Sequence, residues 1–216
     1  MKKIVHYLIL IFILPLLYSY IAEFYRFLFI FNKWLGIINF FNIGIAAYIL
    51  LYVFFISRKI IFIETFEHEL CHTVMAWLTF QKVVSFNANA SGSGNITHTS
   101  DNFLIALAPY FFPIFTIPLI IIRPFIISSV QEYFNFFIGF TLAFHYMGLL
   151  KEFRPVQPDI KKSGFIFSIV VSLFFNLIFT VISMAFASGA YKNVWLYLKD
   201  SAVKSVVYYK SIASLF

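Results

Sequence analysis

Residues 66 to 72, Phe-Glu-His-Glu-Leu-Cys-His, place two carboxylates and two imidazoles in one short stretch. Within it, His68 to His72 form the pattern His-Glu-x-x-His. On a helix, residues i and i+4 lie one above the other, so both imidazoles can reach one metal ion. Glu69 then lies beside the ion without binding it, which suits a general base acting on metal-bound water. Zn²⁺ is the favoured ion, because two imidazoles and one carboxylate leave a fourth position for water.

The composition predicts that this polar cluster lies in a membrane protein. Of the 216 residues, 62% are hydrophobic, 22% aromatic and only 12% charged, and the mean hydropathy is +0.89. No soluble fold of this size can bury so much apolar surface, and the long continuous apolar runs favour helices over a barrel. A charged side chain at the bilayer centre costs about 2.5–3.5 kcal/mol on insertion scales. A bound dication would offset much of that cost.

The charge pattern and the single cysteine exclude several classes of protein. The net charge is +7, but the lysines and arginines are scattered between apolar runs, which suits lipid headgroups and disfavours nucleic acid as a partner. Cys71 is the one cysteine, so an internal disulfide is excluded. The basic start and long apolar run of the N-terminus predict an uncleaved first span, since no small-residue cleavage site follows.

We predict an all-α membrane protein with about six transmembrane helices, because each needs roughly 20 apolar residues. The fourth span contains Pro109, Pro113 and Pro118, so a kink or break is expected there. The predicted spans are Ile4–Ala22, Leu35–Ile56, Ile60–Phe80, Phe103–Ile122, Phe125–Leu150 and Gly164–Ala187.

Two further segments have patterns of their own. Val83–Thr99 has strand-like ends around the Gly-rich sequence Ser-Gly-Ser-Gly-Asn, which favours a short β-hairpin over a flexible loop. The tail, Tyr191–Phe216, is amphipathic and fits either a helix on the membrane surface or one packed on the protein. We therefore divide the chain into N-terminal spans (1–59), a metal-binding membrane core (60–188) and an amphipathic tail (189–216).

A zinc site built on His68 and His72 needs a third ligand, and Asp159 is the preferred candidate. It lies in the irregular sequence Gln-Pro-Asp-Ile-Lys-Lys-Ser-Gly, just before an apolar span, where backbone can enter a protein-lined cavity. The alternative is a solvated aspartate or a helix cap. Less favoured candidates for the third ligand are Asp101, His98, His145 and Glu152.

These motifs resemble the site-2 protease family of intramembrane zinc metalloproteases. The matching features are His68, Glu69 and His72 in an apolar helix, a later aspartate near another span, and the Gly-rich stretch Gly92–His98. The resemblance implies that His68, His72 and Asp159 bind zinc and that Glu69 activates water. It also implies a membrane-spanning protein or peptide as substrate, within a multi-pass protein of a bacterial cell membrane.

Two points set this chain apart from the expected pattern. The commoner second motif of the family ends in Leu-Asp-Gly, whereas here Asp159 is followed by Ile160. Counting spans also places the start of the third and the end of the fifth on opposite sides, so the segment after Leu150 must extend towards the histidines. Two other functions stay open: a polytopic transporter or channel with a polar path, and a membrane protein that binds zinc only for structure.

Overall fold

The computed structural model describes residues 2–36, 38–56, 60–89, 92, 94–99 and 102–214. Over these residues the chain is mostly helical with one two-stranded antiparallel sheet. The helices and strands, in chain order, are α1 (Lys2–Leu35), α2 (Phe40–Leu51), α3 (Ile61–Leu78), β1 (Val83–Ala88), β2 (Gly94–His98), α4 (Phe103–Leu107), α5 (Thr116–Ile122), α6 (Gln131–Glu152), α7 (Pro158–Ser163), α8 (Phe165–Ala187) and α9 (Lys192–Ala213).

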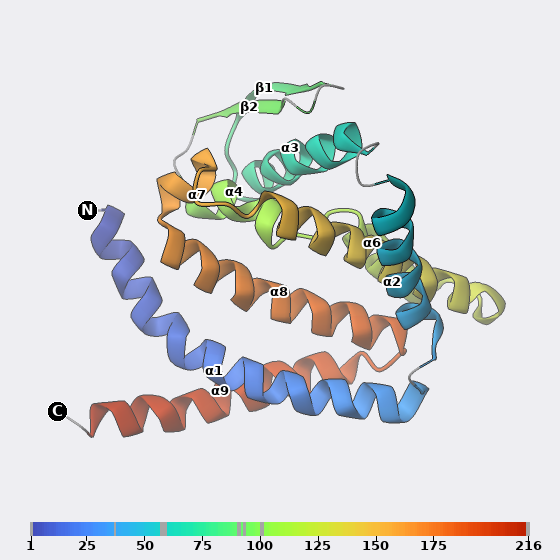
Figure 1. Cartoon of the computed structure of the whole chain (residues 1–216). Helices are drawn as coiled ribbons and strands as arrows, with labels where there is room; N and C mark the ends of the chain where they lie inside the picture. Colours follow the sequence, from blue (N-terminus) through green and yellow to red (C-terminus); the bar gives the residue numbers. More distant parts are fainter. Residues whose placement is uncertain are drawn as a thin grey trace.

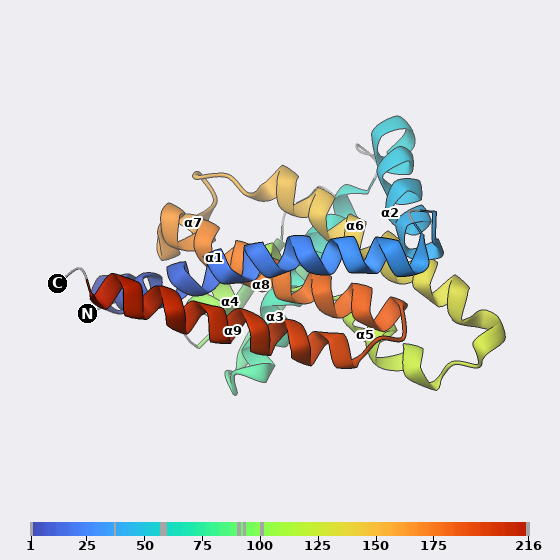
Figure 2. The same ribbon diagram turned by 90° about the horizontal axis from the view of Figure 1, so that it is seen from below.

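The elements are stacked in layers, as Figure 1 shows. The β1–β2 hairpin lies on one outer side, above α3, and the pair α1 and α9 lies on the other, with α8 between them. Seen from below, α1 and α9 run side by side across the molecule (Figure 2). The element that carries His-Glu-x-x-His is therefore enclosed between the hairpin and the helical layers.

Within the part of the chain that the structure describes, three helices are long and apolar enough to cross a membrane: Ile4–Lys33, Ser128–Glu152 and Phe165–Ala187. Phe40–Phe55 and Thr116–Phe125 form shorter apolar helices. The structure thus supports a membrane protein with three candidate spans, and the number of six stays a prediction. Helix α3 has only 18 residues and contains three buried glutamates, Glu64, Glu67 and Glu69.

The fourth predicted span is broken, and prolines explain why. Helix α4 stops at Leu107, a 3₁₀ turn follows over Ala108–Tyr110, and α5 begins only at Thr116. Pro109 lies in the first turn of that 3₁₀ segment, and Pro113 precedes α5 by three residues. A proline removes a backbone N–H donor and clashes with the preceding helical turn, so it ends a helix at such positions. The break leaves α4 beside α3.

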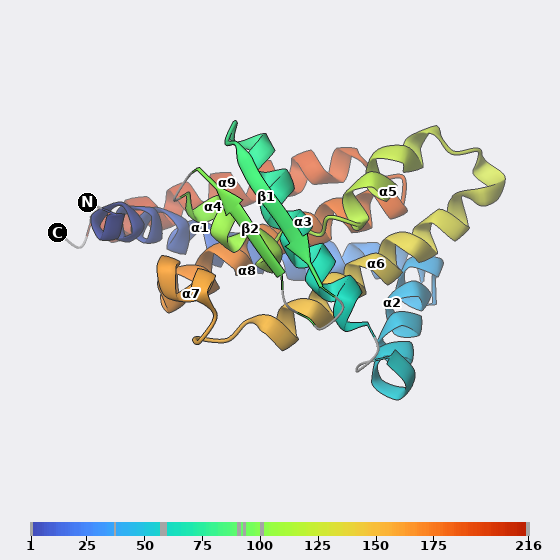
Figure 3. The same ribbon diagram turned by 90° about the horizontal axis from the view of Figure 1, so that it is seen from above.

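The hairpin predicted after α3 is present. Strands β1 and β2 pair in antiparallel register, with Phe86 opposite Ile96 and Ala88 opposite Gly94. Both strands pack on α3, and β1 lies over that helix when the molecule is seen from above (Figure 3). The rings of Phe66 on α3 and Phe86 on β1 meet edge to face, with their centroids 5.8 Å apart. The helix that carries the His-Glu-x-x-His pattern is thus covered by a β layer.

The C-terminal tail is helical and packs on α1. Tyr197 is buried and donates a hydrogen bond of 2.9 Å to the carbonyl of Tyr20. Lys204 forms an ion pair with Glu23, whose side chain is only 6% exposed. The tail thus packs on the protein, and its contact with a membrane surface stays a prediction. The division of the chain at residues 59 and 188 stays a prediction.

Candidate metal centre

Helix α3 presents His68 and His72 on one face, because they are four residues apart. Their ring centroids lie 4.9 Å apart. Asp159, from the first turn of α7, points its Oδ2 atom at both. That oxygen lies 3.6 Å from Nε2 of His68 and 3.5 Å from Nε2 of His72. One ligand atom from each residue lies within 4.8 Å of the other two.

This donor set fits a zinc ion. Ligand atoms about 2.0–2.2 Å from a tetrahedral ion lie about 3.3–3.6 Å from one another, and the two distances to Asp159 agree with that spacing. Two imidazoles and one carboxylate are a catalytic type of set, because they leave the fourth position free. The side chains of His68 and Asp159 are 14% and 27% exposed, so the centre is only partly buried.

The second ring nitrogen of each histidine also has a hydrogen-bond partner. Nδ1 of His68 lies 2.6 Å from Oε2 of Glu152, the last residue of α6. Nδ1 of His72 lies 2.7 Å from the carbonyl oxygen of Ile105 on α4. With the proton on Nδ1, each ring donates to its acceptor and turns the lone pair of Nε2 towards Asp159. Such acceptors fix the tautomer and the orientation of a metal-binding imidazole.

A short turn and a proline bring Asp159 to the histidines. Helix α6 ends at Glu152, and α7 begins at Pro158, which needs no N–H donor at a helix start. Both Glu152 and Asp159 reach His68 in this way. Burial alone would raise the pKa of Asp159, but the imidazoles of His68 and His72 outweigh burial and hold that pKa below its usual range. Asp159 is therefore an anion ready to bind a cation.

Glu69 lies between the two histidines in sequence and is buried. Its carboxylate interacts electrostatically with both imidazoles. Strand β2 covers it closely: a Cβ added to Gly94 would lie 2.4 Å from Oε1 of Glu69. Only a glycine leaves room for the glutamate at this point, so hairpin and carboxylate occupy adjoining space.

A second set of polar side chains lies behind α3. Nδ1 of His145 is 3.4 Å from Oε1 of Glu67, and Nε2 of His145 is 3.3 Å from Oδ1 of Asn176. Asn176 in turn donates a hydrogen bond of 2.8 Å to the carbonyl of Tyr110. His145 is thus a packed histidine within a buried network, and it does not belong to the group formed by His68, His72 and Asp159.

The structure places four of the predicted site residues together: His68, Glu69 and His72 on α3, and Asp159 on α7. Of the less favoured candidates, Glu152 contacts His68 as a hydrogen-bond acceptor. Asp101 and the side chain of His98 lie outside the described residues. The role of Glu152 was missed from sequence, although its place at the end of an apolar helix, seven residues before Asp159, was a usable signal.

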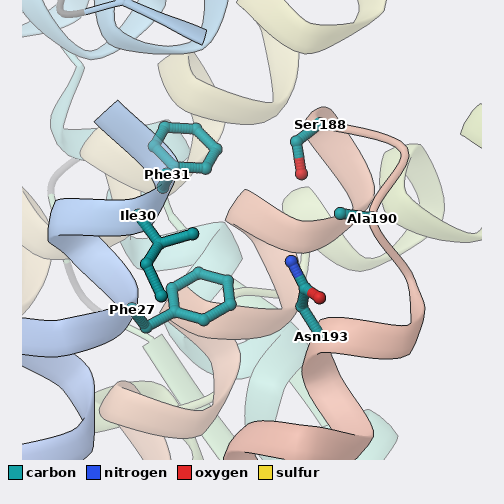
Figure 4. A pocket seen from close by; sticks show the side chains of 6 residues that line it. All are labelled: Phe27, Ile30, Phe31, Ser188, Ala190 and Asn193. Atoms are coloured by element: carbon teal, nitrogen blue, oxygen red, sulfur yellow. The ribbon is translucent and has the colours of Figure 1, made fainter. Parts of the chain in front are cut away.

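A pocket of about 290 Å³ lies elsewhere in the molecule (Figure 4). It is lined by Phe27, Ile30 and Phe31 of α1, by Asn193 of α9, and by Ser188 and Ala190 of the turn before α9. None of these residues belongs to the metal centre.

A partly buried His₂Asp set with a neighbouring glutamate, in a helical membrane protein, is typical of membrane metallopeptidases. The family model for Peptidase M50B-like proteins matches residues 41–152, which is about half of the chain. The chain belongs to this family, the site-2 proteases, whose members are zinc metalloproteases. The matched segment runs from α2 to the end of α6, so it includes His68, Glu69 and His72 and ends before Asp159. No curated protein and no solved structure matches the chain.

Proposed function

We propose that this chain is an intramembrane zinc metallopeptidase that hydrolyses peptide bonds of membrane-embedded proteins or peptides. The observation that carries the proposal is the convergence of His68, His72 and Asp159 beside Glu69, in a member of a metallopeptidase family. We further propose that the protein is a multi-pass protein of a bacterial cell membrane. The three candidate spans support membrane insertion.

In this proposal, each site residue has one role. His68, His72 and Asp159 hold the zinc ion, which when bound supplies a Lewis acid that polarises the substrate carbonyl. The Glu69 carboxylate takes a proton from water as the water oxygen bonds to the carbonyl carbon. Glu69 then gives this proton to the amine nitrogen as the carbon–nitrogen bond breaks. Glu152 and the Ile105 carbonyl keep the imidazoles oriented.

The substrate must be locally unwound, because a helix hides its carbonyl groups in hydrogen bonds. The hairpin lies over α3 and is placed where an extended segment could pair with it as an added strand.

Zinc analysis and cleavage together test the proposal. Detergent-purified wild-type protein is expected to hold about one zinc ion per chain and to cleave a single-span substrate. His68→Ala should lose both, whereas Glu69→Gln should keep zinc and lose cleavage, because amide and carboxylate have the same shape but only the carboxylate accepts the proton.

A matched control is His6→Ala, since His6 lies on α1 and stacks on Phe167 with a centroid distance of 4.1 Å. This variant should keep both zinc and activity. Metal-free wild-type protein that is folded would contradict the proposal and favour a transporter or channel. If the wild type binds zinc and Glu69→Gln is fully active, Glu69 is not the general base. If the wild type binds zinc but cleaves nothing, the ion is structural.

A further inference from the structure

Tyr110 has an unusual position beside the metal centre. The side chain is fully buried, and its hydroxyl has no hydrogen-bond partner within the described part of the chain. Its ring meets the ring of His68 edge to face, with centroids 5.7 Å apart and planes at 85°. The hydroxyl is also close enough to Asp159, Glu152 and Glu69 to interact electrostatically with their carboxylates.

The surrounding structure fixes where this tyrosine lies. It ends the 3₁₀ turn that contains Pro109, and its carbonyl accepts a hydrogen bond of 2.8 Å from Asn176. Its ring also packs edge to face on Phe153, with centroids 5.3 Å apart. These contacts leave the ring little freedom to turn its hydroxyl elsewhere.

An unpaired buried hydroxyl lowers the stability of a protein, so native structures seldom keep one without a reason. The charged groups nearest to the centre, Glu69, Glu152 and Asp159, are carboxylates and accept hydrogen bonds when ionised. Peptide hydrolysis, however, places negative charge on the carbonyl oxygen, and that oxygen needs a donor. A phenol that is preorganised and unpaired before the reaction is suited to this task.

We propose that Tyr110 is a further catalytic residue, whose hydroxyl donates a hydrogen bond to the substrate carbonyl oxygen as that oxygen gains negative charge. The inference rests on the proposed peptidase function. No proton is transferred in this step: Tyr110 keeps its proton, and Glu69 carries the proton from water to the leaving amine. The hydrogen bond is strongest in the transition state, so it accelerates the reaction without tightening substrate binding.

The test compares Tyr110→Phe with Tyr48→Phe. Tyr48 on α2 is a matched control, because its hydroxyl is likewise buried and without a partner among the described residues, while its ring packs on Phe140 and Phe144. For Tyr110→Phe we expect kcat to fall by about 10² to 10³-fold, the loss typical of one oxyanion donor. Zinc content and KM should stay unchanged. Tyr48→Phe should keep the wild-type kcat.

Two measurements besides activity separate catalysis from structure. Both variants should be at least as stable to heat as the wild type, since each loses an unpaired buried hydroxyl. A phosphinic peptide, which mimics the tetrahedral state, should bind Tyr110→Phe at least tenfold more weakly than wild type, whereas a product peptide should bind both equally.

The inference is overturned if kcat of Tyr110→Phe stays within threefold of wild type, or if this variant loses zinc, stability or folding, because the hydroxyl is then structural. In both cases wild-type cleavage leaves the proposed function standing. If the wild type neither binds zinc nor cleaves, the proposed function and this inference fail together.

Discussion

At the level of single residues, the centre includes two hydrogen-bond acceptors that lie outside the predicted ligand set. The side chain of Glu152 comes from α6 and the carbonyl of Ile105 from α4, yet each contacts Nδ1 of one histidine on α3. The contact of His68 with Glu152 joins a carboxylate to an imidazole, and such a charge raises the basicity of the ring. Loss of the hydrogen-bond acceptor should therefore weaken metal binding more at His68 than at His72.

This difference predicts the effect of Glu152→Gln. The amide oxygen can still accept from Nδ1 of His68, but the charge is lost, so zinc affinity should fall by about 10–100-fold. Competition with a chelator of known affinity measures this change. Glu132→Gln, at the exposed start of the same helix, is the control and should bind zinc like wild type. Equal affinity of the two variants would show that the charge of Glu152 does not support the centre.

At the level of elements, the hairpin and α3 are fitted to each other at Gly94. A Cβ at this position would lie 2.6 Å from Cγ of Glu69 and 2.8 Å from Cγ2 of Thr65. These distances are too short for real contacts, so either the strand or the Glu69 side chain would have to shift. Glycine at this point leaves room for the Glu69 side chain beside His68 and His72.

We therefore expect Gly94→Ala to lower kcat while zinc stays bound, because the ligands themselves are not displaced. A shift of about 1 Å in a reacting group can cost about 100-fold in rate, and kinetics on the single-span substrate would measure it. Gly148→Ala on α6 is the control, since a Cβ there meets nothing within 4 Å, and it should keep the wild-type rate. Unchanged kinetics of Gly94→Ala would mean that the hairpin moves freely away from Glu69.

The sequence allowed some elements to be predicted and not others, for physical reasons. Long apolar runs identified α1, α6 and α8, because helices in lipid need continuous hydrophobicity. Prolines indicated the break before α5, and the Gly-rich stretch indicated the hairpin. The contact between Asp159 and the histidines was proposed from its place before an apolar span and strengthened by the family resemblance, since no local pattern encodes a contact between residues so far apart in sequence. For the same reason, Glu152 was considered only as a metal ligand, and Tyr110 had no visible partner before the fold was known.

At the level of the whole molecule, the layer of α1 and α9 lies outside the segment that matches the family model. An ion pair between Lys204 of α9 and Glu23 of α1 joins the two helices of this layer. The Oε2 atom of Glu23 also lies 3.7 Å from a guanidinium nitrogen of Arg26. Glu23 is buried in an apolar interface, so its charge needs a partner there. This layer is therefore expected to contribute stability and not chemistry.

Lys204→Met tests that separation. Among the described residues, loss of the ammonium leaves Glu23 with the exposed Arg26 as its ion-pair partner, so unfolding should become easier by about 1–3 kcal/mol. Zinc content per folded chain should be unchanged. Denaturation in detergent with metal analysis measures both, and Lys199→Met, at an exposed position of the same helix, is the control. A loss of zinc from folded Lys204→Met would show that the outer layer does shape the centre.

Helix α3 is tied to the end of α6 at two places one turn apart. Lys151 forms an ion pair with Glu64, and Glu152 contacts His68. These two side-chain contacts couple the position of α3 to that of the end of α6. Any tilt of α6 within the bilayer, for example on a change of lipid thickness, would then be passed directly to the imidazole of His68.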